Sequence, residues 1–423
     1  MTAADPHPAA RRAVEAVCRI ESARLIAGLV RIVRDVGTAE DLAQDALVIA
    51  LETWPRTGVP PNPGAWLMST ARHRAVDELR RRYRYRDKLA ELGRGLAAQQ
   101  DTAGHAMDAA IDDHIGDDLL RLVFITCHPV LTTPSRVALT LRLLGGLTTT
   151  EIARGFLATE PAVAQRIARA KQTLATKRVA FEIPTPDQMG QRLASVLEVI
   201  YLIFNEGYSA TAGADWMRPA LCDEALRLGR VLAGLMPDEP EVHGLLSLME
   251  LQASRLPART GPSGQPILLT DQDRGRWDRL LIRRGLAALA RAEALANTFG
   301  PYALQAAIAA CHARAATPQQ TDWGRITALY QVLAYVWPSP IVELNRAVAV
   351  GMAVGPAEAL SLVDALRAQG SLDTYPHLPA VRGDLLTKLG RHAEARDEFT
   401  QAAKLTRNDS ERSLFLAQAQ TSD

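Results

Sequence analysis

The stretch GGLTTTEIARGFLATEPAVAQRIARAKQTLATKR, residues Gly145 to Arg178, has the pattern of two short helices joined by a turn. Thr148 followed by Glu151 forms a capping box, which marks the start of the first helix. Ala158 and Thr159 supply the turn and the cap of the second helix. The apolar residues of the first helix are Ile152, Ala153, Phe156 and Leu157. These signals predict a helix-turn-helix.

The second helix of this pair has an apolar face and a polar face, and no acid interrupts it after Glu160. Its apolar residues fall within a narrow arc: Val163, Ile167, Ala170 and Leu174. Its polar residues project from the other side: Gln165, Arg166, Arg169, Gln172 and Thr173. Arg and Gln can read base edges in the major groove, and Lys or Arg can hold phosphates. The pattern favours DNA binding, although helix pairs of this kind also occur as structural hairpins.

The whole chain is long and nearly neutral. With 423 residues it exceeds one ordinary core, which suggests about two to four domains. Apolar residues make up 48%, and β-branched runs are few, so most segments have helical periodicity and we expect an all-α protein. The chain has 48 Lys and Arg and 47 Asp and Glu, so any charged patch reflects segregation of charge within the chain.

Targeting signals and cysteine motifs are missing from the sequence. The N-terminus lacks the apolar core of a signal peptide, and no window approaches the roughly 18 apolar residues of a membrane helix. We therefore expect a cytoplasmic protein with no membrane partner. The four cysteines lie far apart with no C-x-x-C pair, which predicts buried, reduced thiols. They are Cys18, Cys127, Cys222 and Cys311.

Residues Thr38 to Trp54 predict a helix with an acidic face. Thr38 can cap it, with Asp41 three residues on. The apolar stripe consists of Leu42, Ala46, Ile49 and Ala50. Off that stripe stand acids and amides without a basic residue: Glu40, Asp41, Gln44, Asp45 and Glu52.

Prolines in TWPRTGVPPNPGAW predict a loop, after which AWLMSTARHRAVDELRRRYRYR, residues Ala65 to Arg86, resumes at helical period. One side can be buried through Met68, Ala71, Ala75 and Leu79. The arginine side chains are expected to be exposed to solvent, and Tyr83 and Tyr85 alternate with them in the sequence. A charge run alone is usually a solvated face or a helix end.

The rest of the chain reads as a linker followed by a larger helical half. Residues Leu89 to Asp118 are Ala/Asp-rich and acidic, as expected of a linker. Near the end, Arg382 to Leu405 has the tetratricopeptide pattern of small residues around one large apolar side chain, and Leu344 to Leu366 repeats it less regularly. The pattern positions are Gly383, Gly390, Ala395, Phe399 and Ala402. Such repeats present a concave binding surface and no chemistry of their own.

With its motifs in this order, the chain resembles a bacterial sigma factor of the extracytoplasmic-function group, in the subgroup with a C-terminal helical-repeat extension. The sigma-like part covers about residues 10 to 180. AEDLAQDALVIALETW resembles the helix that binds the β′ clamp helices of RNA polymerase. The resemblance implies that the polymerase-binding residues are Glu40, Asp41, Gln44 and Asp45. It also implies the β flap and promoter DNA as partners.

The resemblance extends to the two DNA-binding segments. PGAWLMSTARHRAVDELRRRYR is similar to the segment that captures the non-template strand of the −10 element, with one unstacked base in a protein pocket. The implied −10 residues are Trp66, Arg72, His73, Arg74, Arg80, Arg81 and Arg82. The helix-turn-helix is similar to the −35 reader, for which the implied residues are Gln165, Arg166, Arg169, Lys171 and Gln172. In the −10 segment, His73 stands where many members of the family have Asn. In the −35-reading helix, Ala164 stands where polar or basic residues are common, so the −35 base sequence that this chain prefers stays open.

The domain organisation implied by the resemblance is two small helical sigma domains followed by a large helical extension. The expected ranges are 10–94 for region 2, 95–117 for the linker, 118–181 for region 4, 182–287 for a family-specific helical part and 288–423 for the repeats. We expect the extension to regulate the sigma domains, and positive control is favoured. We also expect the concave groove of its helical repeats to bind a protein or a ligand.

Two other classes of function are alternatives to a sigma factor: an enzyme and a stand-alone regulator. Cys127-His128 and Asp112-Asp113-His114 lack a third partner at recognisable spacing, and no phosphate loop or H-E-x-x-H occurs, so we expect no catalytic residue, metal or cofactor. A stand-alone regulator with the helix-turn-helix and a ligand-binding repeat domain stays open. It would bind promoter duplex without polymerase.

Overall fold

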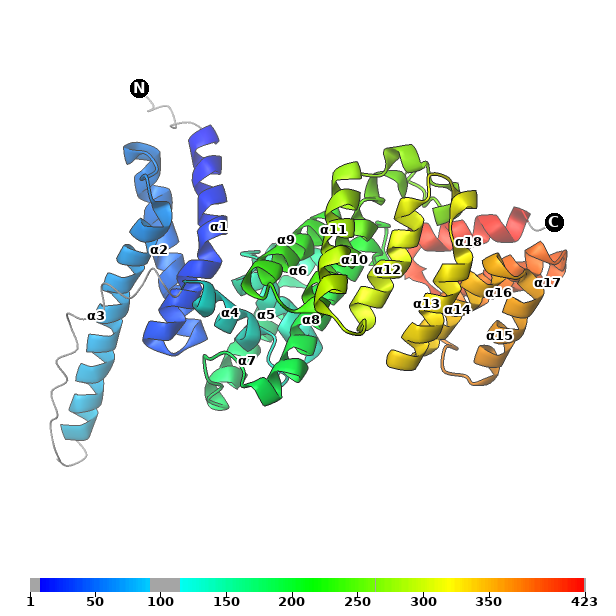
Figure 1. Cartoon of the computed structure of the whole chain (residues 1–423). Coiled ribbons are helices and arrows are strands. Elements are labelled where there is room, and N and C mark those ends of the chain that lie inside the picture. The colour runs from blue at the N-terminus through cyan, green and yellow to red at the C-terminus, as the bar shows by residue number, and fades with distance from the viewer. Residues whose placement is uncertain (1–7, 92–114, 263, 422–423) are drawn as a thin grey trace, which may run out of the picture. The chain divides into compact units, whose positions relative to one another are not determined.

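The computed structural model describes residues 8–91, 115–262 and 264–421, and over these ranges the protein is all-α, as expected (Figure 1). Eighteen α-helices lie in the described ranges, beside two strands of two residues each, β1 (Ala212–Gly213) and β2 (Arg407–Asn408). None of the helices described is long and apolar enough to cross a membrane. The chain divides into two units, residues 1–199 and 200–423.

Three helices begin the first unit: α1 (Pro8–Val33), α2 (Val36–Thr57) and α3 (Pro63–Glu91). Each packs on the other two. The core between them contains Leu29 from α1, Ala43 from α2 and Leu67 from α3, all fully buried. The buried positions recur at three- and four-residue steps, as an amphipathic helix requires.

The start of α2 differs from the prediction that Thr38 is the cap. Asp35 is the N-cap, and its carboxylate accepts a hydrogen bond of 2.7 Å from the backbone N–H of Thr38. The helix therefore begins three residues earlier, because an aspartate before Thr38 satisfies the free N–H groups first. At the other end, α2 continues through Pro55 to Thr57, so the loop predicted from the prolines is shorter than expected.

Four helices follow in the first unit: α4 (Ile115–Thr126), α5 (Thr133–Leu143), α6 (Thr149–Gly155) and α7 (Glu160–Thr176). The capping box of Thr148 and Glu151 is confirmed, with hydrogen bonds in both directions. The apolar face of α7 is also confirmed, because Val163, Ile167, Ala170 and Leu174 are its buried residues. Together α6 and α7 form the predicted helix-turn-helix.

One residue of the predicted apolar face in α6 is misplaced. Leu157 is 57% exposed and lies beyond the end of the helix, at φ 46°. The chain reverses direction there in the left-handed region of backbone space, which turns the leucine side chain away from the core. The sequence prediction was wrong for Leu157 because a periodic pattern does not show where the turn begins.

Helix α8 (Pro186–Tyr208) starts in the first unit and ends in the second. Its first half is hydrogen-bonded to the end of α4: Arg192 donates to the carbonyl of Phe124 (2.8 Å), and Ser195 donates to that of Cys127 (2.6 Å). Arg136 of α5 adds an ion pair of 3.0 Å to Glu198. The start of the extension is thus attached to the helix-turn-helix domain by buried polar contacts.

The second unit continues with helices connected by short turns. They are α9 (Pro219–Leu235), α10 (Pro240–Ala253), α11 (Arg279–Leu295), α12 (Pro301–Arg314), α13 (Trp323–Val336), α14 (Pro340–Ala353), α15 (Pro356–Ala368), α16 (His377–Lys388), α17 (His392–Leu405) and α18 (Asp409–Thr421). Short 3-10 turns occur at η2 (Leu256–Ala258), η3 (Leu269–Asp271), η4 (Arg274–Arg276) and η5 (Pro318–Gln320). The first three lie between α10 and α11.

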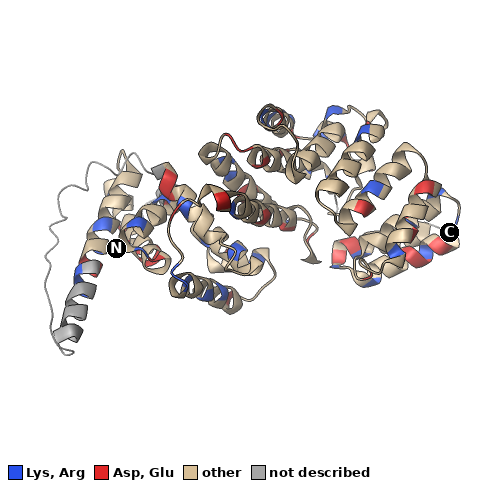
Figure 2. Ribbon diagram, turned by 60° about the horizontal axis from the view of Figure 1, so that its bottom comes forward, with Lys and Arg blue, Asp and Glu red and all other residues tan. Residues whose placement is uncertain are grey.

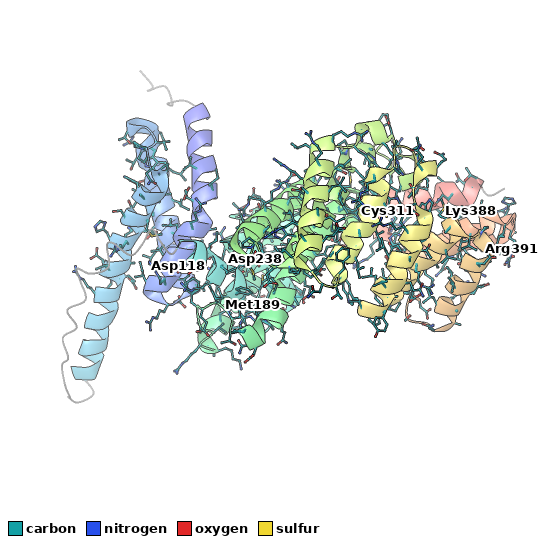
Figure 3. The ribbon with its side chains drawn as sticks, in the orientation of Figure 1. Asp118, Met189, Asp238, Cys311, Lys388 and Arg391 are labelled. Atoms are coloured by element: carbon teal, nitrogen blue, oxygen red, sulfur yellow. The ribbon has the colours of Figure 1, made fainter. Side chains whose placement is uncertain are left out.

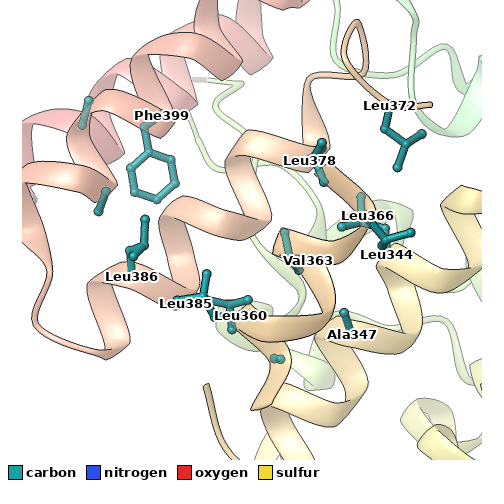
Figure 4. Close-up of a cluster of buried hydrophobic side chains, with 13 residues drawn as sticks. Leu344, Ala347, Leu360, Val363, Leu366, Leu372, Leu378, Leu385, Leu386 and Phe399 are labelled. Atoms are coloured by element: carbon teal, nitrogen blue, oxygen red, sulfur yellow. The ribbon is translucent and has the colours of Figure 1, made fainter. Parts of the chain in front are cut away.

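The last helices pack as antiparallel pairs around an apolar cluster shown in Figure 4. Phe399 of α17 is 3% exposed and packs against the α16 backbone. A Cβ at Gly383 would lie 3.0 Å from the Phe399 ring, so any larger residue there would require the ring to shift by a few tenths of an ångström. The predicted packing roles are confirmed for Gly383, Ala395, Phe399 and Ala402, which are buried, whereas Gly390 is exposed and follows the end of α16 at φ 74°. Parallel pairing of β1 with β2 joins residues 212 and 407 within the same unit.

The described cysteines are free thiols in buried positions, as predicted. Cys127, Cys222 and Cys311 are each buried without a disulfide, and the side chain of Cys18 lies outside the described part. Burial raises the pKa of Cys222 to about 12 and also raises the pKa of Cys127. These thiols stay protonated at neutral pH and pack as small apolar groups.

Candidate nucleic-acid and polymerase interface

Helix α7 presents a polar surface to the solvent. It packs on α5 and α6 through its apolar face, which fixes its orientation. Gln165, Arg169 and Gln172 are exposed, and Arg166 is half-buried. Residues three and four apart share one side of a helix, so these side chains form a continuous row with both hydrogen-bonding and charged groups. A row of this kind can contact base edges and phosphates together.

Lys171 lies on a different side of α7 from this row. Its ammonium forms an ion pair with Glu40 of α2, and its side chain is only 21% exposed. Successive residues of a helix are rotated by about 100°, so Lys171 cannot face the same way as both Arg169 and Gln172. Of the five predicted −35 residues, Lys171 is the one that the structure directs toward another helix.

Glu40 is buried, unlike the other predicted polymerase-binding residues. The residue is 4% exposed, and its carboxylate accepts hydrogen bonds from Nε of Arg142 (2.6 Å) and from Nε2 of Gln44 (2.9 Å). Asp41, Gln44 and Asp45 are exposed on the same helix. The acidic face of α2 therefore has two parts: the carboxylate of Glu40, which is buried within the first unit, and the side chains of Asp41, Gln44 and Asp45, which are exposed to solvent.

Arg142 is a partner that the sequence did not reveal. It belongs to α5, and its NH1 group also donates to the carbonyl of Leu147 (3.2 Å). No local pattern marks it, because its partner Glu40 is 102 residues away. Asp118, which is labelled in Figure 3, makes a second long-range contact. Its carboxylate lies 3.3 Å from Nε of Arg31, and it also lies 2.7 Å from the neighbouring Arg121. Both acids connect helices of the predicted region 2 with those of the predicted region 4.

Helix α3 carries the predicted −10 residues, and Figure 2 shows basic positions along its described part. Trp66 is half-buried, with its ring 5.2 Å from that of Trp54 in an edge-on arrangement. His73, Arg74, Arg80 and Arg81 are exposed, whereas Arg72 is half-buried. The side chain of Arg82 lies outside the described residues. An aromatic ring supported from one side beside exposed arginines is suited to an unstacked base and its phosphates.

Several of these arginines have acidic neighbours. Arg74 lies 2.5 Å from Asp45 of α2, and within α3 Arg81 lies 3.5 Å from Glu78. Arg80 lies 4.0 Å from Asp77. Exposed pairs of this type contribute about 0–1 kcal/mol and exchange readily for other partners. They leave the arginines accessible to phosphates.

Comparison with known proteins identifies the two helical domains. The model of Sigma-70 region 2 matches residues 21–85, and that of Sigma-70 region 4 matches residues 121–174. A family of unknown function, DUF6596, matches residues 192–293. No solved structure gives a significant match.

Two curated proteins show how far the similarity extends. Uncharacterized protein R00370 of Rhizobium meliloti (strain 1021) is 44% identical over 391 residues, which cover 92% of this chain and 91% of that protein. ECF RNA polymerase sigma factor SigK of Mycobacterium ulcerans (strain Agy99) is 35% identical over 133 residues, which cover 30% of this chain and 65% of that protein. Sigma factor families are not enzymes; they act with RNA polymerase on promoter DNA. The chain belongs to the extracytoplasmic-function sigma factors that carry a C-terminal extension.

Proposed function

We propose that α7 of this sigma factor reads the −35 element through Gln165, Arg166, Arg169 and Gln172. The observation that carries this proposal is the split of α7 into one buried face and one exposed face that has no acid after Glu160, the first residue of the helix. A helix anchored in this way can enter the major groove without losing its packing. Lys171 has a different role in the proposal, because it is paired with Glu40 in the free chain.

We propose that α3 holds the non-template strand of the −10 element. The half-buried Trp66 supports a flipped base, and Arg72, His73 and Arg74 lie one to two turns further along the same helix. Arg80, Arg81 and Arg82 extend the basic run toward the backbone phosphates. Stacking of a base on an aromatic ring and neutralisation of phosphates are the two terms that dominate single-strand binding.

The polymerase clamp is the proposed partner of α2. Asp41, Gln44 and Asp45 form an exposed acidic surface that complements the basic partner surface expected from the family. Glu40 can join this surface only after its carboxylate leaves Arg142 and Lys171. Binding of polymerase would therefore separate α2 from α5 and α7, and so free Lys171 on the DNA-reading helix α7.

The extension is proposed to exert positive control through α8. Support comes from the contacts of Arg192 and Ser195, which attach the start of α8 to the end of α4. A chain that ends at residue 199 keeps these contacts, whereas one that ends at residue 181 loses them. If control is positive, both truncated chains should transcribe less than the full chain, and the shorter one should also be less stable. Full, unregulated activity of the longer fragment would contradict positive control.

Run-off transcription tests the proposed sigma activity. Core polymerase is combined with genomic promoter fragments, with and without the full chain, and promoter-specific transcripts should appear only in its presence. Core binding is measured in parallel, so that a silent reaction with bound core indicates a missing signal. Tight binding of promoter duplex by the chain alone, with no core binding, would instead support a stand-alone regulator.

A further inference from the structure

The second unit contains a cavity of about 530 Å³ between α8, α10, α12, α13 and α14. This volume lies within the range of small-molecule sites. Its aromatic lining comes from Tyr201, Phe204, Tyr208, Tyr330, Trp337 and Tyr375. No Asp or Glu is among the described residues that line it. Figure 3 labels Cys311 on α12, directly before the lining residue His312.

Arg255 supplies a buried positive charge to this cavity. It follows α10, is 8% exposed, and its Nε atom is buried without a hydrogen-bond partner. Its guanidinium carbon lies 5.8 Å from the ring centre of Tyr208 and 5.9 Å from that of Trp277. No carboxylate within the described ranges forms an ion pair with Arg255. Aromatic faces attract a cation but do not neutralise it.

Two neighbouring arginines, Arg259 and Arg274, are also buried, and both donate hydrogen bonds to backbone carbonyls, although Nε of Arg274 is buried without a partner, as Nε of Arg255 is. Arg259 donates to the carbonyl of Tyr208 (2.7 Å), and Arg274 donates to the carbonyls of His312 (2.8 Å) and Ala315 (2.7 Å). These acceptors are neutral, so they do not cancel the positive charge of the arginine cluster, which consists of Arg255, Arg259 and Arg274. Burial, followed by the charges of Arg255 and Arg274, lowers the pKa of His312 to about 3. His312 is therefore uncharged at neutral pH, and the cluster stays cationic through its arginines.

A buried charge without a counter-ion is costly, and an anion brought in by a ligand removes that cost. A guanidinium binds a carboxylate or phosphate through two parallel hydrogen bonds, which makes Arg255 suited to either oxyanion. The hydroxyl of Tyr330 can assist as a neutral donor, because burial raises its pKa to about 12. Gln252 and His312 add further buried polar atoms without partners.

We propose that this cavity binds a small organic anion, with its carboxylate or phosphate on Arg255 and its aromatic or apolar body against the tyrosine and tryptophan walls. The ligand would be the signal of the extension, which deepens the proposed regulation. Binding itself does not depend on that regulation, because it can be measured on the purified full chain without polymerase. If the extension proved not to control transcription, the binding result would still stand. If the cavity bound no anion, the proposed control of transcription by the extension would still be open to its own test.

The test uses probes that separate charge from apolar surface. Titration calorimetry compares 2-naphthoate, 2-naphthyl phosphate, neutral 2-naphthol and inorganic phosphate on the wild-type chain. We expect naphthoate or naphthyl phosphate to bind at least tenfold more tightly than both naphthol and inorganic phosphate. Whichever of the two organic anions binds more tightly identifies the preferred oxyanion. Equal binding of naphthol and the naphthyl anions, or no binding of either anion, would overturn the proposal.

Variants connect binding to the residues. Arg255→Gln should weaken anion binding at least tenfold without changing the affinity for naphthol, and Ala309→Phe should abolish binding because Ala309 lines the cavity. Arg291→Gln, which alters an exposed arginine outside the lining, is the matched control and should bind as wild type. If circular dichroism shows that Arg255→Gln does not fold, two other results still test the proposal. They are the ratio of the wild-type affinities for the naphthyl anions and for naphthol, and the loss of binding in Ala309→Phe. Unchanged binding in a folded Arg255→Gln chain would refute the proposal.

Discussion

The carboxylate of Glu40 lies 2.6 Å from Nε of Arg142, although 102 residues separate them in the sequence. This contact joins α2, the proposed polymerase-binding helix, to α5, which supports the DNA-reading helix α7. Lys171 of α7 pairs with the same carboxylate. Residues expected to serve two different partners are thus held together in the free chain.

The first prediction concerns this cluster. Glu40→Gln removes the charged partner of Arg142 and Lys171, whose side chains are 23% and 21% exposed. The loss should lower the free energy of unfolding by about 1–3 kcal/mol, measured by urea denaturation. Asp41→Asn is the matched control, since it alters an exposed acid on the same helix and should change stability by less than about 0.5 kcal/mol. Equal effects of the two variants would show that the buried contact contributes little.

The second prediction separates two basic residues of α7. Arg169→Ala should cost about 1–3 kcal/mol of promoter-binding free energy and relax the preference at one −35 position, because Arg169 is on the exposed row. Lys171→Ala should instead reduce stability, because its ammonium is paired with Glu40. Transcription from templates with each −35 base pair replaced measures the preference. A changed preference in Lys171→Ala, with none in Arg169→Ala, would reverse the assignment.

The third prediction concerns the basic run of α3. If Arg80 and Arg81 each contact a phosphate of the single strand, replacing both with Ala should reduce the slope of log K against log salt by about 1.4. Open-complex formation by the holoenzyme is measured over a range of potassium chloride concentrations. Binding to core polymerase should stay near wild type, and Arg227→Ala in the second unit should leave the slope unchanged. Parallel loss of core binding would indicate misfolding.

The fourth prediction tests the packing of the last helices. Phe399 is buried against Gly383, so Phe399→Ala leaves a cavity and should lower the stability of the second unit by about 3–5 kcal/mol. Leu416→Ala removes a side chain that is 44% exposed and should have a much smaller effect. Guanidinium denaturation followed by circular dichroism gives both values. Similar losses would mean that Phe399 is not a principal packing residue.

The fifth prediction is a dependence of stability on pH. Burial lowers the pKa of His312 from its ordinary value of 6.5 to about 3. Between these values the unfolded chain binds a proton that the folded chain does not, so stability should fall as the pH drops from about 6.5 toward 3. His312→Gln should have a shallower dependence over this window, measured by denaturation at several pH values. Identical slopes for both chains would exclude His312 as a contributor.

The local features of the fold were readable from the sequence. Helical periodicity identified the buried residues of α7, and the Thr148–Glu151 capping box marked the start of α6, because these signals depend on groups within four residues of each other. The same locality explains the errors. Asp35 capped α2 ahead of Thr38, and the turn at Leu157 took that residue out of the apolar face. A pattern gives the face of a helix more reliably than its ends.

The sequence by itself therefore determined the all-α class, the helix-turn-helix, the acidic and basic helices and the small-residue pairing of the last repeats. Only the tertiary structure decided that Glu40 and Lys171 form an ion pair between α2 and α7, and that Arg255 lies beside aromatic rings in a cavity with no acid among the described residues that line it. The physical reason is that helix periodicity arises from neighbours along the chain, whereas the partner of a buried charge depends on which distant helices pack against it.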